Sequence, residues 1–383
     1  MKKLIMIIFA LVFSVNVYAE ELKVAAQGAA LMDAETGRVL WERNMDSPMS
    51  VASTTKIMTA IIALESGKLD ETAIVSKKAV VTPKVRLGLS SGEEYILGDL
   101  LYPLMLQSCN DSAVVIAEHI GGSVEGFAEL MNEKAREIGA KNTKFVTPNG
   151  LDKDDNHSTA YDMALITRYA LENEDFCRLI STPSYSFSSC NGKRSFTVSN
   201  KNRLLNEYEG AIGVKTGFTN KAGHCFAGAA ERNGTQLITV VLASGWGNKG
   251  KEQKWIDTKN LLNYGFENFS LKKVMDKGCE MGTVEVISSK EGSVNAIAAE
   301  DGFAMLSEEE FKGITVEKNL LEAVEAPVRK GEKIGKVSVY TANGEQLFST
   351  DIVAAENIKR HDFETSVKKL INMWLNSPTD GIL

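Results

Sequence analysis

Hydrophobic and polar positions divide the chain into segments of different periodicity. Apolar residues at helical spacing predict helices near 50–66, 96–106, 113–120, 124–138, 161–180 and 252–266. Shorter alternating stretches predict two strands around a turn within 29–43, and further strands at 195–198, 211–215, 225–230 and 237–243. This order predicts an α/β (α+β) domain in which helices cover an antiparallel sheet and a helical insertion separates the first strands from the later ones.

The pattern changes twice more toward the C-terminus. Short alternating stretches from about 274 to 353 predict a small all-β domain of sandwich type, without a cluster of catalytic residue types. From 357 onward apolar residues fall on one side of a helix and lysines on the other. Such an amphipathic helix is typical of a membrane interface, although the same pattern fits a helix docked on its own domain.

The first residues have the pattern of a secretory signal peptide. Lys2 and Lys3 precede an apolar run that ends at Val17-Tyr18-Ala19, with compact residues where a signal peptidase cleaves. The run is shorter than the roughly 20 residues that a spanning helix needs. We therefore predict a signal peptide at 1–19, a catalytic domain at 20–272, a small β domain at 273–356 and an amphipathic membrane-anchor tail at 357–383.

Composition and charge exclude several classes of protein. The chain has 383 residues, is 44% hydrophobic and 24% charged, and carries a net charge of -7. This composition is globular, and the acidic balance argues against a nucleic-acid partner. The four histidines are scattered and no metal-binding Cys or His spacing occurs, so we predict neither a metal nor a cofactor.

The first candidate for catalysis is Ser53-Thr-Thr-Lys56, at the start of a predicted helix. Helical spacing places the Ser53 hydroxyl and the Lys56 amine on one face, so that the amine can take the hydroxyl proton. The positive end of a helix also disfavours a protonated amine. The spacing recurs at Ser270 and Ser366, so an isolated match is equally explained by a solvent-facing pair.

Two further motifs carry polar groups at element ends. Ser108-Cys109-Asn110 lies at a break between apolar helices, where the hydroxyl can relay a proton and the amide can bind a substrate amide. Lys215-Thr216-Gly217 follows an apolar strand, where an ammonium and a hydroxyl can hold a carboxylate while glycine lets a peptide approach as an added strand. The second motif recurs at Ser189-Cys190-Asn191, which precedes a glycine and is interpreted as a hairpin turn, and the alternative for Lys215 is an exposed edge lysine that discourages aggregation.

The three motifs in this order are far more specific than any one of them. With the surrounding AST-T-K-IMTA, QSCNDSA and GVKTGFTNKAG, the chain resembles the low-molecular-mass penicillin-binding proteins of the serine D-alanyl-D-alanine carboxypeptidase type. The resemblance extends over the signal peptide, the catalytic domain, the β domain and the tail. It implies a penicillin-binding/β-lactamase-like fold and an exported enzyme at the outer face of the bacterial cytoplasmic membrane.

The resemblance also implies roles for the catalytic residues. Ser53 is the expected nucleophile toward the bond between the terminal D-alanines of a peptidoglycan pentapeptide, with an acyl-enzyme that water hydrolyses. Lys56 is the expected general base, and Ser108 passes the proton to the leaving amine. β-Lactams are expected to acylate Ser53 and to leave slowly.

Five residues are expected to bind the substrate. Asn110 orients a substrate amide, Lys215 and Thr216 bind the terminal carboxylate, Gly217 allows close approach, and the backbone N–H of Phe218 completes an oxyanion hole with that of Ser53. In the segment after Asn149, we expect a buried pair of His157 and Asp162 to hold a loop.

The chain departs from the family pattern in two places. Many relatives have His where this chain has Phe218, and many have Arg in a segment that here offers only Lys249, Lys251 and Lys254.

Two other functions are alternatives to the carboxypeptidase. A β-lactamase of class A is disfavoured because no Glu-x-x-Leu-Asn segment follows the second motif. A catalytically silent β-lactam sensor or wall-binding protein is disfavoured by the complete set of motifs.

Overall fold

A five-stranded antiparallel sheet organises the first part of the chain. The computed structural model describes residues 22–361 and, in the tail, 367, 368, 371, 372 and 375. The sheet has the order β2-β1-β9-β8-β7. Its strands are β1 (Gly28–Asp33), β2 (Val39–Arg43), β7 (Ala211–Thr219), β8 (Gly223–Arg232) and β9 (Thr235–Leu242). The first two strands are separated from the other three by the helices, as the sequence predicts.

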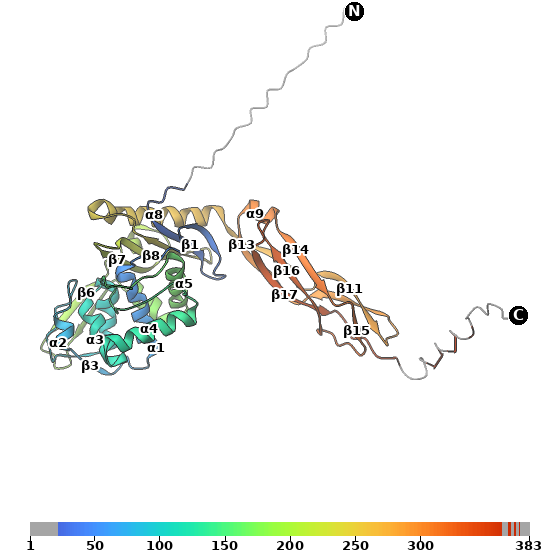
Figure 1. Cartoon of the computed structure of the whole chain (residues 1–383), viewed down its shortest axis with the longest axis horizontal. Coiled ribbons are helices and arrows are strands. Elements are labelled where there is room, and N and C mark those ends of the chain that lie inside the picture. Colours follow the sequence, from blue (N-terminus) through green and yellow to red (C-terminus); the bar gives the residue numbers. More distant parts are fainter. Residues whose placement is uncertain (1–21, 362–366, 369–370, 373–374, 376–383) are drawn as a thin grey trace, which may run out of the picture.

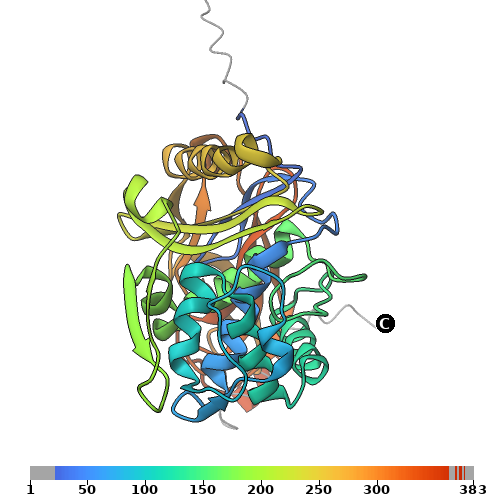
Figure 2. The same ribbon diagram turned by 90° about the vertical axis from the view of Figure 1, so that its left-hand side faces the viewer.

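Helices cover both faces of this sheet, as Figures 1 and 2 show. The long helix α8 (Gly247–Asn268) packs Trp255, Leu261 and Leu262 against one face. The helices on the opposite face are α1 (Lys56–Glu65), α3 (Asn110–Gly121), α4 (Val124–Ile138), α5 (Ala160–Leu171) and α6 (Glu174–Ser181). The predicted helix at 161–180 is thus two helices, which Asn173 separates by capping the second one.

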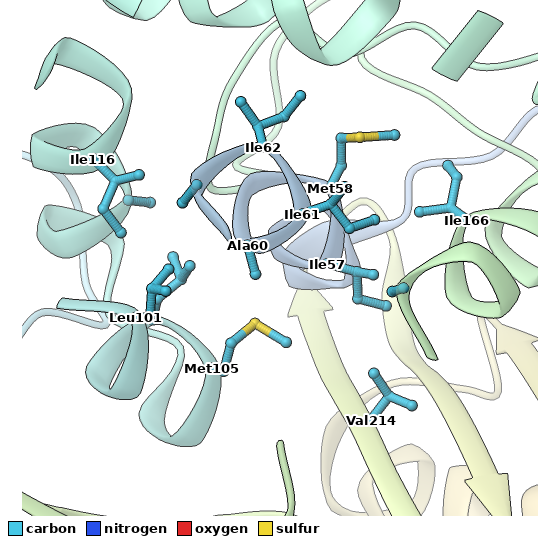
Figure 3. Packing of buried hydrophobic residues seen from close by; sticks show 14 of the residues in the cluster. Ile57, Met58, Ala60, Ile61, Ile62, Leu101, Met105, Ile116, Ile166 and Val214 are labelled. Atoms are coloured by element: carbon cyan, nitrogen blue, oxygen red, sulfur yellow. The ribbon is translucent and has the colours of Figure 1, made fainter. Parts of the chain in front are cut away.

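Helix α1 lies at the centre of the helical layer. All eight residues from Lys56 to Ala63 are buried. Figure 3 shows Leu101, Met105, Ile116, Ile166 and Val214 around it, from neighbouring helices and from β7. Because apolar contacts hold it on every side, α1 is a fixed platform for residues at its N-terminal end.

Shorter elements connect the helices to the sheet. They are the 3₁₀ helix η1 (Ala52–Thr55), β3 (Thr72–Ile74), α2 (Lys77–Val80), β4 (Glu94–Ile96), the 3₁₀ helix η2 (Gly98–Leu100), the π-helix η3 (Pro103–Gln107), β5 (Ser184–Ser188), β6 (Ser195–Ser199) and α7 (Leu204–Glu207).

Two of the sequence predictions differ from these elements. The segment predicted as a helix at 96–106 is helical from Gly98 to Gln107, but as a 3₁₀ helix that begins at Gly98 and a π-helix that begins at Pro103 rather than as one α-helix. The predicted strand at 195–198 pairs with β5 in a separate hairpin.

A second unit of short strands follows α8. It consists of β10 (Ser270–Met275), β11 (Glu280–Ile287), β12 (Ser293–Ala298), β13 (Gly302–Leu306), α9 (Glu308–Lys312), β14 (Thr315–Leu320), β15 (Ala323–Glu325), β16 (Lys333–Tyr340) and β17 (Gln346–Ala354). Six of these strands form a sheet of order β14-β16-β17-β12-β11-β15, while β10 pairs with β13. The unit has its own hydrophobic core, so the predicted small all-β fold is confirmed.

One arginine ties the two units together. Arg38, in the turn between β1 and β2, donates to the backbone oxygen of Met305 at 2.7 Å, to Glu310 Oε1 at 2.6 Å and to Glu345 Oε2 at 2.9 Å. Glu310 also closes the capping box of α9 with Ser307. The guanidinium thereby joins three separate segments of the second unit to the turn, and we call this group the Arg38 clamp.

The described residues include no helix that is long and apolar enough to cross a membrane. The predicted signal peptide lies outside the described residues, as does most of the predicted tail. Residues 357–361 continue the β unit through the bridge between Val328 and Ile358, while 367, 368, 371, 372 and 375 are helical. Two apolar side chains among the helical residues, Ile371 and Leu375, are 50% and 68% exposed.

Candidate active site

Ser53 and Lys56 meet at the N-terminal end of α1. Ser53 lies in the 3₁₀ turn η1, and Lys56 begins the α-helix that follows. A 3₁₀ turn has three residues per turn and aligns positions i and i+3, whereas an α-helix leaves them offset. Lys56 Nζ is 2.9 Å from Ser53 Oγ. The predicted pair is therefore present, on a tighter turn than the expected α-helix.

The Lys56 amine is fully buried and surrounded by oxygen atoms. Besides Ser53 Oγ, it contacts Asn110 Oδ1 and the backbone oxygen of Asn149, each at 2.7 Å. Burial and the nearby Lys215 lower the pKa of Lys56 well below its usual value. A neutral amine has two N–H groups and one lone pair, so the two carbonyl oxygens can take the N–H groups. The lone pair then remains for the Ser53 hydroxyl.

Asn110 holds its position through both ends of its amide. Its Oδ1 accepts from Lys56, its Nδ2 donates to the Pro83 oxygen at 3.0 Å, and its backbone N–H donates to the Val85 oxygen at 2.8 Å. One of the two Nδ2 hydrogens stays available for a substrate carbonyl. Ser108, at the left-handed end of η3 with φ 67°, makes no hydroxyl hydrogen bond to any described residue.

The next residue, Asp111, fastens a segment beside Asn110. We call residues 83–89 the strap. The fully buried Asp111 carboxylate accepts from the backbone N–H groups of Leu87 at 2.9 Å, Gly88 at 2.8 Å and Leu89 at 3.3 Å. Its place in the first turn of α3 also suits a negative charge. In the sequence this aspartate directly follows the second motif, but no local pattern shows which segment its carboxylate binds.

Strand β7 brings the third motif against Ser53. It is an edge strand, so one side is open for an added peptide strand. A Cβ atom on Gly217 would lie 3.0 Å from the Ser53 backbone nitrogen and 3.1 Å from the Val51 oxygen. Any side chain would press on these atoms, so glycine lets the backbone around Phe218 lie next to that of Ser53. Lys215 is buried and donates to the Thr216 oxygen at 3.1 Å.

A second buried lysine lies near Lys215. Lys254 of α8 is 6% exposed, whereas Lys249 and Lys251 are exposed. Burial and the charge of Lys254 lower the pKa of Lys215 to about 7, and burial lowers that of Lys254 to about 8. Neither lysine has a salt bridge to a described carboxylate. Buried cations without a counter-charge favour an anionic ligand.

A histidine lies beneath Phe218. The Phe218 side chain is 44% exposed, and its ring stacks on His224 of β8 with centroids 4.3 Å apart. The His224 Nε2 atom is 3.1 Å from the Gly247 oxygen. Burial, and then Lys254, lower the pKa of His224. The chain thus has an imidazole on the neighbouring strand rather than after the third motif.

The described repeats of the first two motifs lie on other elements than the site. The spacing at Ser270 lies on strand β10, and Ser366 lies outside the described residues. Ser189-Cys190-Asn191 is the turn of the β5–β6 hairpin, where Ser189 Oγ is 2.9 Å from Asn191 Oδ1. The chain therefore has one described place where serine, lysine and asparagine converge.

The expected His157–Asp162 pair is wrong. Asp162 is buried and holds a loop by accepting from Asn142 N and Thr143 Oγ1, each at 2.7 Å. The His157 ring instead contacts the Asp155 backbone oxygen at 2.8 Å. Sequence reasoning also missed Asn149, because its main-chain oxygen leaves no side-chain signal.

Comparison with known proteins agrees with this geometry. A family model described as D-alanyl-D-alanine carboxypeptidase, peptidase family S11, matches residues 15–245, more than half of the chain. The chain belongs to this serine peptidase family. A second model, the C-terminal domain of penicillin-binding protein 5, matches residues 269–360.

Individual relatives cover nearly the full length of this S11 peptidase. It is 30% identical over 360 residues to D-alanyl-D-alanine carboxypeptidase DacF of Bacillus subtilis, and the aligned region covers 92% of this chain and 91% of the relative. It is also 30% identical to D-alanyl-D-alanine carboxypeptidase DacC of Escherichia coli, with 95% and 93% covered. The crystal structure of penicillin binding protein 5 from Haemophilus influenzae matches with a TM-score of 0.71 and 29% identity, covering 88% of this chain and 98% of that one.

Proposed function

We propose that this chain is an exported, penicillin-sensitive D-alanyl-D-alanine carboxypeptidase that removes the terminal D-alanine from peptidoglycan stem peptides. The observation that carries the proposal is the buried Lys56 amine, 2.9 Å from Ser53 Oγ, with two carbonyl oxygens on its other contacts. This arrangement suits a neutral lysine that takes a proton from serine.

The proposed reaction has two steps. Ser53 Oγ attacks the carbonyl between the two D-alanines while Lys56 accepts its proton, and the oxyanion accepts hydrogen bonds from the backbone N–H groups of Ser53 and Phe218. Ser108 passes this proton from Lys56 to the amine of the leaving D-alanine, so that Lys56 is neutral again. Water then attacks the acyl-enzyme while Lys56 takes a proton from it and returns a proton to Ser53 Oγ, which releases the shortened peptide. Each step breaks one bond to the acyl carbon and forms another.

The terminal carboxylate of the substrate is proposed to lie over Lys215 and Thr216, with Lys254 as the second cation. Their burial and their lack of a counter-charge among the described residues support this role. Gly217 leaves room for the substrate backbone along β7, and Asn110 donates to the carbonyl on the acyl side.

The proposed organisation has a signal peptide at 1–19, a catalytic domain at 20–272, a β domain at 273–356 and a tail at 357–383 that lies on the membrane surface. The exposed Ile371 and Leu375 support an interfacial tail. Deletion of 357–383 should move the protein from the membrane fraction to the soluble fraction. Retention on the membrane would contradict the anchor.

One pair of assays tests the reaction. The purified full-length chain is incubated with diacetyl-L-Lys-D-Ala-D-Ala and, separately, with labelled penicillin. D-alanine release together with a long-lived adduct at Ser53 supports the proposal. Rapid penicillin hydrolysis would indicate a β-lactamase, and an adduct without D-alanine release a sensor.

The chain offers a matched control for the nucleophile. Ser53→Ala should abolish both D-alanine release and penicillin labelling. Ser270→Ala removes the serine of the repeated spacing, on strand β10, and should leave both unchanged. Full activity of the Ser53→Ala chain would refute the mechanism.

A further inference from the structure

The strap borders the part of the cleft that holds the acyl portion of the substrate. In the proposed reaction, the terminal carboxylate lies at Lys215 and the scissile carbonyl at Ser53, so the rest of the peptide extends past Asn110. Asn110 binds two strap oxygens directly, Pro83 at 3.0 Å and Val85 at 2.8 Å. The strap therefore lies beside the path that the upstream residues of a stem peptide would take, and forms a wall there.

This wall is basic and solvent-exposed. The segment 77–86, KKAVVTPKVR, has cations at Lys77, Lys78, Lys84 and Arg86 and contains no carboxylate. Lys84 and Arg86 are both exposed, and they flank the exposed Val85 at the point where Asn110 holds the strap. Their backbone is fixed by the Asn110 and Asp111 contacts rather than free in solvent.

The two cations of the strap have no anionic partner among the described residues. Nearby surface cations do: Lys78 pairs with Glu125 at 3.3 Å, and Arg194 pairs with Glu93 at 2.9 Å. Among the residues that the structure describes, the Arg86 guanidinium donates to the Val80 backbone oxygen alone, at 2.6 Å. The adjacent Asp111 does not pair with Lys84 or Arg86, because its carboxylate is fully buried and is bound by backbone N–H groups.

We propose that Lys84 and Arg86 bind a carboxylate in the acyl portion of the substrate, so that the enzyme prefers acidic stem peptides. This inference rests on the proposed function. A peptide in extended conformation advances about 3.5 Å per residue, so a carboxylate two residues upstream of the penultimate D-alanine lies roughly 7 Å farther along. That distance is within reach of long side chains anchored beside Asn110. The two residues thus determine specificity without taking part in the bond-breaking step.

The test compares two peptides that end in D-Ala-D-Ala and differ only in Glu or Gln two residues before the penultimate D-alanine. The full chain should show a kcat/KM about fivefold higher for the Glu peptide at low salt, the size expected for solvent-exposed charge pairs, and less at high salt. The double variant Lys84→Gln, Arg86→Gln should lose this preference and keep its rate on the Gln peptide. Lys290→Gln, an exposed lysine of the second unit, is the matched control and should keep the preference.

Several results would overturn the inference. They are equal rates on both peptides in the unaltered chain, a preference that survives in the double variant, or an equal loss on both peptides, which would mark the strap as structural only. Absence of D-alanine release from both peptides would instead contradict the proposed function. In that case, calorimetry still measures the affinity of the Ser53→Ala chain for each of the two peptides, and the difference between the two affinities gives the charge preference without any reaction.

Discussion

Replacement of Lys254 by Met gives a direct test of the buried positive charge near β7. The substitution keeps an unbranched side chain that is one atom shorter, and it removes one of two cations proposed to hold the terminal carboxylate. A hydrogen bond to a charged group contributes about 1.5–3 kcal/mol, so kcat/KM should fall about 10- to 100-fold. The loss should appear mainly in KM, because the contact is the same in the ground state and the transition state.

The pH profile supplies a second and independent readout. Carboxylate binding needs protonated Lys215, whose pKa is lowered to about 7 by burial and by Lys254, so kcat/KM should fall as pH rises above that value. Lys56 must be neutral, so the rate should rise with pH at the acid end, giving a bell-shaped profile. In Lys254→Met the like charge is gone. The pKa of Lys215 therefore rises and the alkaline limb moves to higher pH.

The assay is D-alanine release from diacetyl-L-Lys-D-Ala-D-Ala between pH 5 and 10, since this substrate has no amine that titrates. Lys254→Arg keeps the charge and should retain the alkaline limb near its original position. Lys249→Met, at an exposed position of α8, should behave like the unaltered chain. An unchanged KM together with an unchanged alkaline limb in Lys254→Met would refute the role of Lys254.

Three further substitutions test the surroundings of the site. Asp111→Ala removes the acceptor of three strap N–H groups and should lower the free energy of unfolding by about 2–4 kcal/mol, measured by urea denaturation; an unchanged midpoint would contradict the tie. Gly217→Ala places a Cβ 3.0 Å from the Ser53 nitrogen and should slow acylation by labelled penicillin at least about tenfold, with little loss of thermal stability, whereas a normal rate would show that the backbones can separate. Arg38→Ala removes the contacts to Glu310 and Glu345 and should broaden the distribution of distances between spin labels on the two units; an identical distribution would show that the clamp does not fix them.

The sequence predicted what depends on local pattern. The central sheet, its helical insertion and the small β unit follow from periodicity, and the first two motifs identify Ser53, Lys56 and Asn110 because each keeps its residues within a few positions. The segment expected as an α-helix at 96–106 is helical from Gly98 to Gln107, but as a 3₁₀ turn that begins at Gly98 and a π turn that begins at Pro103, and apolar periodicity does not distinguish these from an α-helix.

Contacts between distant segments could not be predicted in the same way. Lys254 lies on a helix far along the chain from Lys215, and a count of candidate lysines could not distinguish it from Lys249, since only packing against the sheet buries it. The Asn149 oxygen that binds Lys56 belongs to the main chain, which every residue has. The tie between Asp111 and the strap likewise depends on a fold that brings two loops together.

The Arg38 clamp has a consequence for where in the cell wall the enzyme can work. The second unit begins two residues after α8 and extends away from the catalytic unit, with β16 and β17 running along its length (Figure 1). Strands of eight and nine residues span roughly 30 Å at about 3.3 Å per residue. With the tail on the membrane, as proposed, a second unit held by the clamp would carry the cleft up to about this distance from the lipid. The height at which the enzyme meets its stem peptides would then depend on a single side chain, Arg38.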